Sequence, residues 1–473
     1  MDRPKLTVVA RAVVFALLSL TAFAAPAGAR TRTTTTTTSS PGASRFYISG
    51  AGFGHGVGMS QYGAAGFALH GYKYEQILAH YYSGTSLGKL APKRMVTVLL
   101  HEGSAVFQHA TAIVGFPKKL NPAHTYRVIP DGSKLRIVSG GHRLGIFTPP
   151  VTVHGGRAPL TLVGQGAYDG AFLLRLDGKG GVMTVDSVPV DEYVRGVVTE
   201  EMPSRWPAQA LEAQAVAART YAIAAPAVTP DFDLYDDTRS QMYGPVSTET
   251  ATGNAAVAAT SGTVVEYEGH PAVTYFFSSS GGSTESVQNV WYKFAPEPWL
   301  RGVKDPYDDA YANPYYRWMD SYTLASAEHK LGTLCRGTLE GVKITQTGVS
   351  PRVVRALVVG THGASTVTGT QLQQLFETRS TYMSFATLTE KGERTRTVVS
   401  HAKKVTIQLT VEGTVYPAKR GQTVTAQRYA GAGWRSVSRG RLSAKGSYVA
   451  VVKAPGTYRI VYKGLDGPNV RVP

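Results

Sequence analysis

The clearest helical periodicity in this chain lies between Val190 and Ala225. Glu201 continues an apolar stripe with helical spacing, whereas Glu200 points roughly 100° away from it. Pro203 disfavours helical geometry in the residue before it, so the first helix is predicted to end near Glu201. We therefore expect Glu201 to be the partly buried carboxylate of the pair. The stripe is formed by Val194, Val197 and Val198.

A second helix is predicted to start at Pro207 and to run to the residue before Pro226. Small residues on one face would allow close packing, and Arg219 could then reach back toward the corner between the two helices. That corner would form the floor of an active site. The face consists of Leu211, Ala215, Ala218 and Ala222.

Outside this region, short alternating apolar and polar runs predict antiparallel strands from 94 to 176, and again from about 398 to the end. Two further helices are expected at about 60–70 and 74–82. The predicted fold class is α+β. It comprises a core over 46–390 with an antiparallel β subdomain at about 93–176, followed by a C-terminal all-β sandwich domain at 398–473.

The predicted position of Glu201 has chemical consequences. Burial, the neighbouring charge of Glu200 and the negative end of a helix dipole each raise the pKa of a carboxyl group. A carboxylic acid that keeps its proton near neutral pH can act as a general acid. The alternative is that both glutamates are solvated helix-end residues and that Arg219 is their surface partner.

Residues 1–29 are predicted to be a secretory signal peptide. Arg3, Lys5 and Arg11 precede a short apolar run at 12–25, and Ala27-Gly28-Ala29 follows it as a cleavage pattern of small residues. The expected location is therefore secreted and cell wall associated, with an uncleaved anchor as the alternative. Residues 30–45 are rich in Thr and Ser and are predicted to form a flexible linker. The single cysteine, Cys335, excludes an internal disulfide framework.

The formal net charge of +17 is concentrated near the C-terminus, where residues 391–473 hold 16 Lys and Arg against three acids. Outside the cell the available polyanions are wall polymers and membrane headgroups, whereas a nucleic acid partner would contradict the signal. We therefore expect the C-terminal domain to bind anionic wall polymers. The alternative is an immunoglobulin-like spacer whose charge only aids solubility.

The stretch EYVRGVVTEEMPSRWPAQALEAQAVAARTYA resembles the core motif of the SpoIID/LytB family, which comprises stage II sporulation protein D and the amidase-enhancer domain. The resemblance implies a lytic transglycosylase that acts on peptidoglycan glycan strands. The catalytic acid of the family's EMP motif would be Glu201. The Arg in its AVAARTYA motif would be Arg219, and Gln214 in the same block is a substrate-binding candidate.

A second block, GHGVGMSQYGA, resembles another signature of the same family. On its own, His55 would be taken as a histidine in a turn, since five glycines between Gly50 and Gly58 predict a loop with close backbone approach. The resemblance instead implies that His55 belongs to the catalytic set and that Gln61 contacts substrate. In better-known members this block follows the EMP region, so the motif order in this chain looks permuted. We expect His55 and Glu201 to share one cleft.

Two further motifs, QMYG and SSSGGSTE, resemble family motifs and supply more candidates for sugar-hydroxyl contacts or tight turns. Some family members hold a metal through Cys and His near these motifs, but this chain has Tyr235, Ser240 and Phe277 there. We therefore predict no structural metal and no cofactor. An aromatic-rich segment at 291–318 is as consistent with a glycan groove as with core packing. The substrate-binding candidates in the two motifs are Gln241, Tyr243, Ser278, Ser280 and Glu285.

The leading functional hypothesis is a secreted lytic transglycosylase in which one carboxylate, Glu201, forms 1,6-anhydro ends while Arg219 and His55 hold substrate or stabilise developing charge. An ordinary glycosidase needs a second carboxylate, and the sequence nominates none. The first alternative is a non-catalytic wall-binding enhancer of an N-acetylmuramoyl-L-alanine amidase. A structural surface protein is a weaker alternative.

Overall fold

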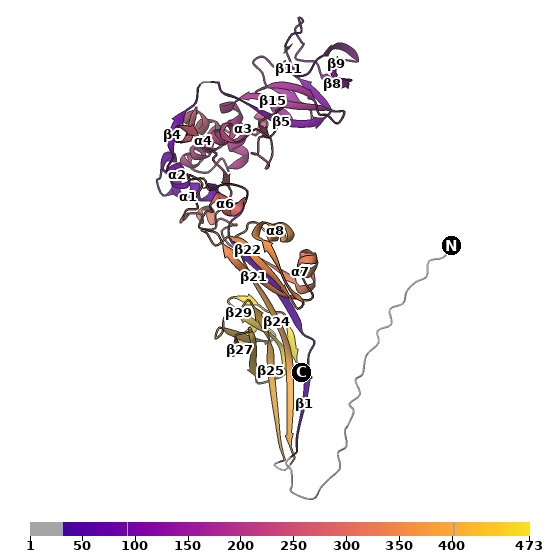
Figure 1. Cartoon of the computed structure of the whole chain (residues 1–473), viewed down its shortest axis with the longest axis vertical. Coiled ribbons are helices and arrows are strands. Elements are labelled where there is room, and N and C mark those ends of the chain that lie inside the picture. The colour runs from indigo at the N-terminus through magenta and orange to yellow at the C-terminus, as the bar shows by residue number, and fades with distance from the viewer. Residues whose placement is uncertain (1–31, 92, 401–402) are drawn as a thin grey trace, which may run out of the picture.

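Antiparallel strands form most of the framework, and helices are gathered in the middle of an elongated molecule (Figure 1). The computed structural model describes residues 32–91, 93–400 and 403–473. The predicted signal peptide at 1–29 lies outside these residues. Among the helices that are described, none is long and apolar enough to cross a membrane. The mixture of helices and antiparallel sheets agrees with the predicted α+β class.

One end of the molecule is a β subdomain built from two six-stranded sheets, with strand orders β16-β5-β15-β14-β11-β7 and β10-β9-β8-β6-β12-β13. The predicted antiparallel structure is present here and continues to Pro189. The strands are β5 (Met95–Gly103), β6 (Ala105–Gln108), β7 (Ala112–Ile113), β8 (Tyr126–Asp131), β9 (Lys134–Ser139), β10 (His142–Phe147), β11 (Val151–His154), β12 (Leu160–Leu162), β13 (Gly166–Tyr168), β14 (Ala171–Leu176), β15 (Val182–Pro189) and β16 (Leu234–Tyr235).

The middle of the molecule is helical and is organised around α4 (Ala208–Ala224), most of whose side chains are buried. The chain passes from β15 directly into α3 (Val190–Glu201), which ends as predicted because Met202 is extended, with φ −128° and ψ 140°. Small side chains on α4 let its neighbours pack closely. The other elements here are α1 (Gln61–Leu69), α2 (Tyr74–Tyr81), α5 (Ala251–Ala259), α6 (Val287–Val290), β4 (Ser86–Lys89), β17 (Thr263–Tyr267) and β18 (His270–Pro271).

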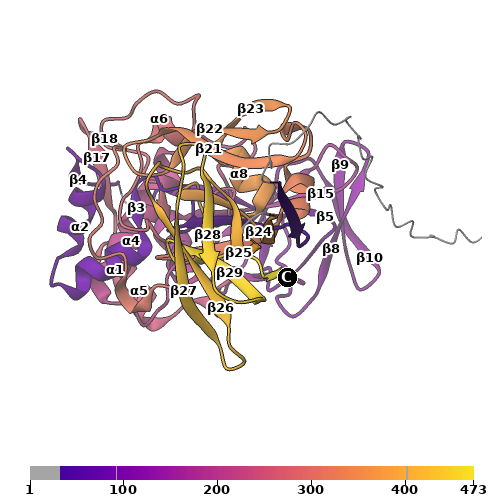
Figure 2. The same cartoon turned by 90° about the horizontal axis from the view of Figure 1, so that it is seen from below.

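A short parallel pair joins the beginning of the chain to a segment more than 200 residues later. Strand β3 (Met59–Ser60) pairs with β19 (Phe276–Phe277). This pairing brings the glycine-rich block that contains His55 beside the residues around Phe277. Viewed along the long axis, α1 and α2 lie on one side of the molecule, whereas β8, β9 and β10 lie on the other (Figure 2).

A smaller unit below the helices has its own apolar core, in which Phe46 and Phe376 are buried. It combines a three-stranded antiparallel sheet with two helices. Its elements are α7 (Leu324–Leu331), β21 (Leu339–Thr347), β22 (Val353–Gly360), β23 (Gly363–Thr368) and α8 (Gly369–Phe376).

The predicted boundary between a core ending at 390 and a sandwich starting at 398 is wrong, because one strand, β24 (Met383–Val399), runs through it. This strand pairs with β2 (Ala43–Gly50) on one side and with β25 (Lys404–Tyr416) on the other. The sandwich therefore shares a sheet with the preceding unit. The remaining strands are β20 (Trp318–Thr323), β26 (Thr423–Tyr429), β27 (Trp434–Arg441), β28 (Ser447–Val452), β29 (Gly456–Tyr462), β30 (Leu465–Asp466) and β31 (Val470–Val472).

The prediction for the threonine tract is also wrong. Residues 30–45 were expected to be a flexible linker, but Thr33–Ser39 form strand β1, which pairs with β24 from Thr33↔Val399 to Ser39↔Glu393. All seven residues of β1 are exposed. Composition misleads here because a strand at a sheet edge needs main-chain partners and β-branched residues, but no apolar core.

Candidate active site

A cleft of about 410 Å³ lies where the two helices of the corner meet the glycine-rich block. His55 and Glu201 both line it, which confirms the expected shared cleft. The walls come from six separate stretches of the chain. The lining residues are Phe53, Gly54, His55, Glu201, Tyr221, Thr238, Arg239, Ser240, Tyr275, Phe276, Phe277, Ser278 and Trp291.

Glu201 is the last residue of α3, and its carboxylate is fixed by two hydrogen bonds from different elements. The Gln61 side-chain amide donates to Oε2 at 3.1 Å, and the Met242 backbone N–H donates to Oε1 at 3.0 Å. Gln61 is the first residue of α1, and Ser60 caps that helix by accepting from Gly63 N–H at 3.2 Å. The carboxyl group is therefore held in one orientation at the rim of the cleft.

The pKa of Glu201 is raised above its ordinary value, chiefly because burial disfavours the charged form. The hydrogen bonds from Met242 and Gln61 oppose this shift, and the neighbouring charge of Glu200 adds a smaller rise. Glu200 itself is exposed, whereas Glu201 is partly buried. The exposure of Glu200 and the partial burial of Glu201 agree with the helical spacing in the sequence.

His55 reaches the cleft with both ring nitrogens engaged by the backbone. Nε2 lies 3.0 Å from the Phe276 carbonyl, and Nδ1 accepts from Val57 N–H at 3.1 Å. Burial, with the nearby cation Arg352 as a second cause, lowers the pKa of His55 to about 4. A neutral ring does not offer positive charge to a transition state, so the expectation that His55 stabilises charge is not supported. The ring instead packs against Trp291, with centroids 5.1 Å apart.

The close backbone approach predicted for the glycines of this block is present, and the atoms they approach belong to the protein itself. Gly56 has φ +90°, and a Cβ there would lie 2.4 Å from Arg352 Nε. At Gly58, with φ +76°, a Cβ would lie 2.0 Å from the Tyr275 carbonyl oxygen. The glycines thus allow the His55 loop to pack directly on Arg352 and on the backbone at Tyr275, the residue before β19.

Aromatic side chains form much of the cleft wall. Tyr275 and Trp291 lie 4.7 Å apart between ring centroids, and Phe53 is 41% exposed. Of the aromatic-rich segment at 291–318, Trp291 reaches the cleft, whereas Trp318 is buried and donates to the Gly52 carbonyl at 2.9 Å.

Several cleft residues were missed from the sequence, among them Tyr221 and Arg239. Tyr221 lies on α4 two residues after Arg219, on a different face of the helix. Arg239 follows β16 and is exposed, with its guanidinium paired to Asp237 at 2.7 Å and lying 3.5 Å from the ring centroid of Tyr235. Tyr221 lies about 200° around the helix from Arg219, so the expectation that Arg219 faces the cleft pointed to the wrong face of α4.

The prediction that Arg219 reaches toward Glu201 is wrong. Its side chain is fully buried and pairs with Asp191, in the first turn of α3, at 2.5 Å. It also donates to the Thr263 carbonyl at 3.1 Å. Arg219 therefore binds the start of α3 to β17, at the opposite end of α3 from Glu201.

Five other predicted substrate contacts also lie outside the cleft, because each is buried within the fold. Gln241 accepts from Tyr193 Oη at 2.8 Å, and Tyr243 donates to Asp186 at 2.8 Å. Glu285 accepts from the Ser350 hydroxyl at 2.6 Å, while Gln214 and Ser280 have no exposed surface. Of the residues predicted in these two motifs, Ser278 is the one that lines the cleft.

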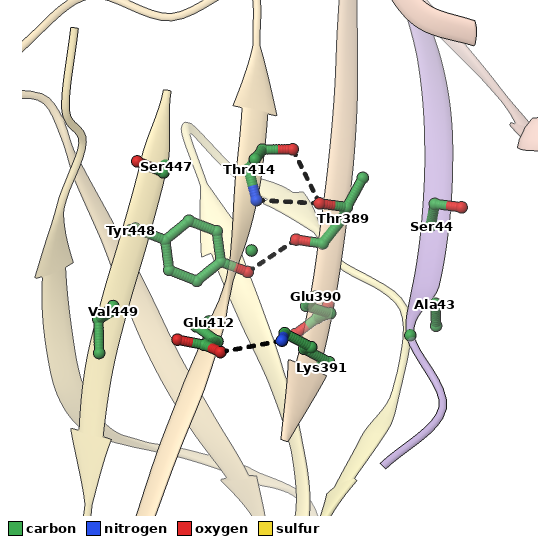
Figure 3. Close-up of a pocket in the computed structure, with 12 residues that line it drawn as sticks. Ala43, Ser44, Thr389, Glu390, Lys391, Glu412, Thr414, Ser447, Tyr448 and Val449 are labelled. Atoms are coloured by element: carbon green, nitrogen blue, oxygen red, sulfur yellow. Dashed lines mark hydrogen bonds and ion pairs between the residues drawn. The ribbon is translucent and has the colours of Figure 1, made fainter. Parts of the chain in front are cut away.

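A second hollow, of about 530 Å³, lies on the long sheet where β24, β25 and β28 meet (Figure 3). Several of its polar groups bond to one another, although the buried Glu390 Oε1 has no hydrogen-bond partner. Tyr448 Oη donates to the Thr389 carbonyl at 2.9 Å, Thr414 N–H donates to Thr389 Oγ1 at 2.9 Å, and Lys391 lies 3.2 Å from Glu412. This hollow therefore offers few free groups to a ligand.

The part of the chain that the structure describes contains no cluster of three or more His, Cys, Asp or Glu side chains suited to a metal ion. The absence of a metal requirement stays a prediction.

Residues 178–267, which include Glu201, match the family model described as SpoIID, stage II sporulation protein. Stage II sporulation protein D of Bacillus subtilis (strain 168) is 29% identical over 258 residues, which cover 51% of this chain and 72% of that protein. An amidase enhancer of the same strain is 37% identical over 140 residues, covering 30% of this chain and 18% of that protein. An uncharacterized protein of Brachyspira hyodysenteriae is 36% identical over 137 residues, covering 28% and 37%.

Proposed function

Since this chain belongs to the SpoIID/LytB family, we propose that it is a secreted lytic transglycosylase that cleaves peptidoglycan glycan strands with Glu201 as its catalytic acid. The relatives support a role related to the cell wall. The finer assignment rests on the chemistry of the cleft.

One observation carries the proposal. Among the described residues that line the cleft, Glu201 is the only carboxylic acid. Glycosidases that use water need a second carboxylate about 5–9.5 Å from the first, either as nucleophile or as base. A single carboxyl group suffices when the nucleophile is the hydroxyl of the sugar itself.

The reaction then needs two proton transfers at Glu201. The protonated carboxyl group gives its proton to the glycosidic oxygen as the bond to the anomeric carbon breaks. The resulting carboxylate takes the proton of the sugar's 6-hydroxyl as that oxygen bonds to the same carbon, which closes a 1,6-anhydro ring. Glu201 is thereby returned to its protonated form, and no water is consumed.

A line of aromatic rings extends from the cleft and would suit a glycan strand, because aromatic faces bury the apolar faces of sugar rings. Phe53 contacts Tyr315, with centroids 4.8 Å apart, and Tyr315 contacts Tyr62 at 6.2 Å. Tyr62 in turn packs on Trp206 at 4.8 Å, and Trp206, which is only 5% exposed, supports Tyr62 and the exposed Tyr311 from the core side. His55 would act here as a neutral part of the wall that holds the backbone at Phe276.

Product analysis tests this proposal. The purified chain alone, incubated with intact and with peptide-stripped glycan strands, should release fragments whose ends are one water lighter than hydrolysed ends. Failure to release such fragments from either substrate would contradict lytic transglycosylase activity.

The second candidate is a non-catalytic enhancer of an N-acetylmuramoyl-L-alanine amidase, and the similarity to an amidase enhancer favours it. In that case the chain alone would release no glycan fragments but would increase peptide release by an added amidase. Running the same digest with and without the amidase separates the two candidates.

We also propose that the basic sandwich attaches the protein to anionic wall polymers. On β27, Arg435, Arg439 and Arg441 are exposed, and on the loop between β25 and β26 Lys419 and Arg420 are exposed as well. Wall association of this kind should weaken as salt screens these charges.

A further inference from the structure

Three strands project beyond the sandwich as a flap that has no second layer on either side (Figure 1). We define the flap as residues 33–39 of β1, 394–399 of β24 and 404–408 of β25. Every residue of β1 and the first five residues of β25 are exposed. Both faces of the flap are therefore exposed to solvent, and each can be compared for its side chains.

The two faces of the flap differ. Directly paired residues of antiparallel strands share a face, so the register assigns each side chain. The threonine face holds Thr35 against Thr397 and Thr37 against Thr395, with hydroxyl contacts of 3.5 and 3.2 Å. The aliphatic face holds Thr34, Thr36, Thr38, Arg394, Arg396, Val398, Val405 and Ile407.

The aliphatic face continues the buried inner face of the sandwich. Along β25, Val411 is fully buried and Leu409 is 7% exposed, but Ile407 is 51% exposed and Val405 is 48% exposed. The alternation of apolar residues thus continues past the point where the second sheet stops covering it. Exposed aliphatic side chains in such a row indicate a contact surface.

The same end of the flap is strongly basic. Residues 32–38 and 394–408 contain no Asp or Glu. They contain five Lys and Arg residues, which are Arg32, Arg394, Arg396, Lys403 and Lys404. A surface that joins cations to exposed aliphatic groups is complementary to anionic lipid headgroups above hydrocarbon. A soluble polyanion would satisfy the charges but not the aliphatic side chains, and a second copy would bring like charges together.

The path of the chain supports the same partner. Arg32 N–H donates to Ser400 Oγ at 3.2 Å, and Ser400 N–H donates to the Arg32 carbonyl at 3.1 Å. Residues 1–31, which include the apolar run at 12–25, therefore join the described chain at the tip of the flap.

We propose that the aliphatic face of the flap binds the surface of an anionic phospholipid bilayer. Val398, Val405 and Ile407 enter the headgroup region while Arg394 and Arg396 pair with lipid phosphates. This contact is independent of the lyase chemistry of the cleft.

An environment-sensitive dye on either face tests the contact directly. In the full chain with Cys335→Ser, Thr36→Cys places the dye on the aliphatic face and Thr37→Cys places it on the threonine face. With vesicles of phosphatidylglycerol and phosphatidylcholine, the emission of the dye at 36 should shift to the blue, and that at 37 should not. The shift should disappear with pure phosphatidylcholine and in the Val405→Thr, Ile407→Thr double variant.

Four results would overturn the proposal. They are no shift at 36, equal shifts at 36 and 37, an equal shift with soluble polyphosphate in place of vesicles, and a shift that depends on protein concentration without vesicles. The third result would identify a polyanionic polymer as the partner, and the fourth would identify a second copy of the chain.

Discussion

Glu201 lies between influences that act on its pKa in opposite directions, with burial raising the value and two hydrogen-bond donors lowering it. The net rise favours the protonated form that a general acid needs. Glu201→Gln keeps the shape of the side chain but cannot transfer the proton, so turnover should fall by at least ~100-fold. Glycan binding and the melting temperature should change little.

The matched control is Glu200→Gln. Glu200 is adjacent but exposed, so its variant should stay close to wild-type turnover. Comparable losses in the two variants, or wild-type turnover in Glu201→Gln, would refute the assignment of Glu201 as the acid.

Gln61 gives a prediction about pH. Its amide stabilises the charged carboxylate of Glu201, so Gln61→Leu should raise the pKa of Glu201 further. Activity falls as pH rises through the pKa of the acid, so the alkaline limb of kcat/KM should move to higher pH. The exposed Gln165 supplies a control, Gln165→Leu, whose profile should match the wild type. A limb that moves to lower pH in Gln61→Leu would show that the amide does not act through Glu201.

At this scale helical periodicity predicted the partly buried Glu201, because periodicity is a local signal. The family resemblance implied Gln61, His55 and Ser278, which lie in or beside the cleft. It failed for Arg219, whose partner Asp191 comes from the start of the neighbouring helix. A charged residue in a small-residue helix can face either a cleft or a buried partner, and only the packing of α3 on α4 decides which. Tyr221, on the other face of α4, occupies the cleft instead.

Among the elements, the loop around His55 depends most on glycine. Gly56→Ala should lower stability, because left-handed backbone is unfavourable by about 1–2 kcal/mol for other residues and the overlap with Arg352 adds about 1–3 kcal/mol. Gly71 has a similar φ of +85° with open space around it, so Gly71→Ala should show only the backbone effect. Thermal unfolding of the two variants measures the difference, and equal losses would contradict the close packing of the loop.

The elements also show where composition misleads. The corner helices and the antiparallel strands of the β subdomain were predictable, since their apolar periodicity reflects burial on one face. Strand β1 was not, because its threonines are exposed on both faces and its order comes from main-chain pairing with β24. That partner lies more than 350 residues away in the sequence, and no local pattern indicates it.

For the whole molecule, β24 determines which parts can be separated. A chain ending at Glu390 would lose β25 and expose Tyr47 and Leu388, whose burial against the sandwich contributes about 1.5–3 kcal/mol each. We expect this truncation to lower the melting temperature and to increase proteolysis of the remaining chain. A truncated chain that unfolds at the wild-type temperature would show that the sandwich is an independent domain after all.

The central claim is that one carboxylate cleaves the glycan strand by intramolecular attack, and digestion in water enriched with heavy oxygen tests it most directly. If Glu201 directs the sugar's own 6-hydroxyl to the anomeric carbon, each cut should leave one 1,6-anhydro end and one hydroxyl end that keeps the glycosidic oxygen. Mass spectrometry should then find heavy oxygen in neither of the new ends. Heavy oxygen at new reducing ends would mean that water is the nucleophile, and would contradict a single-carboxylate lyase.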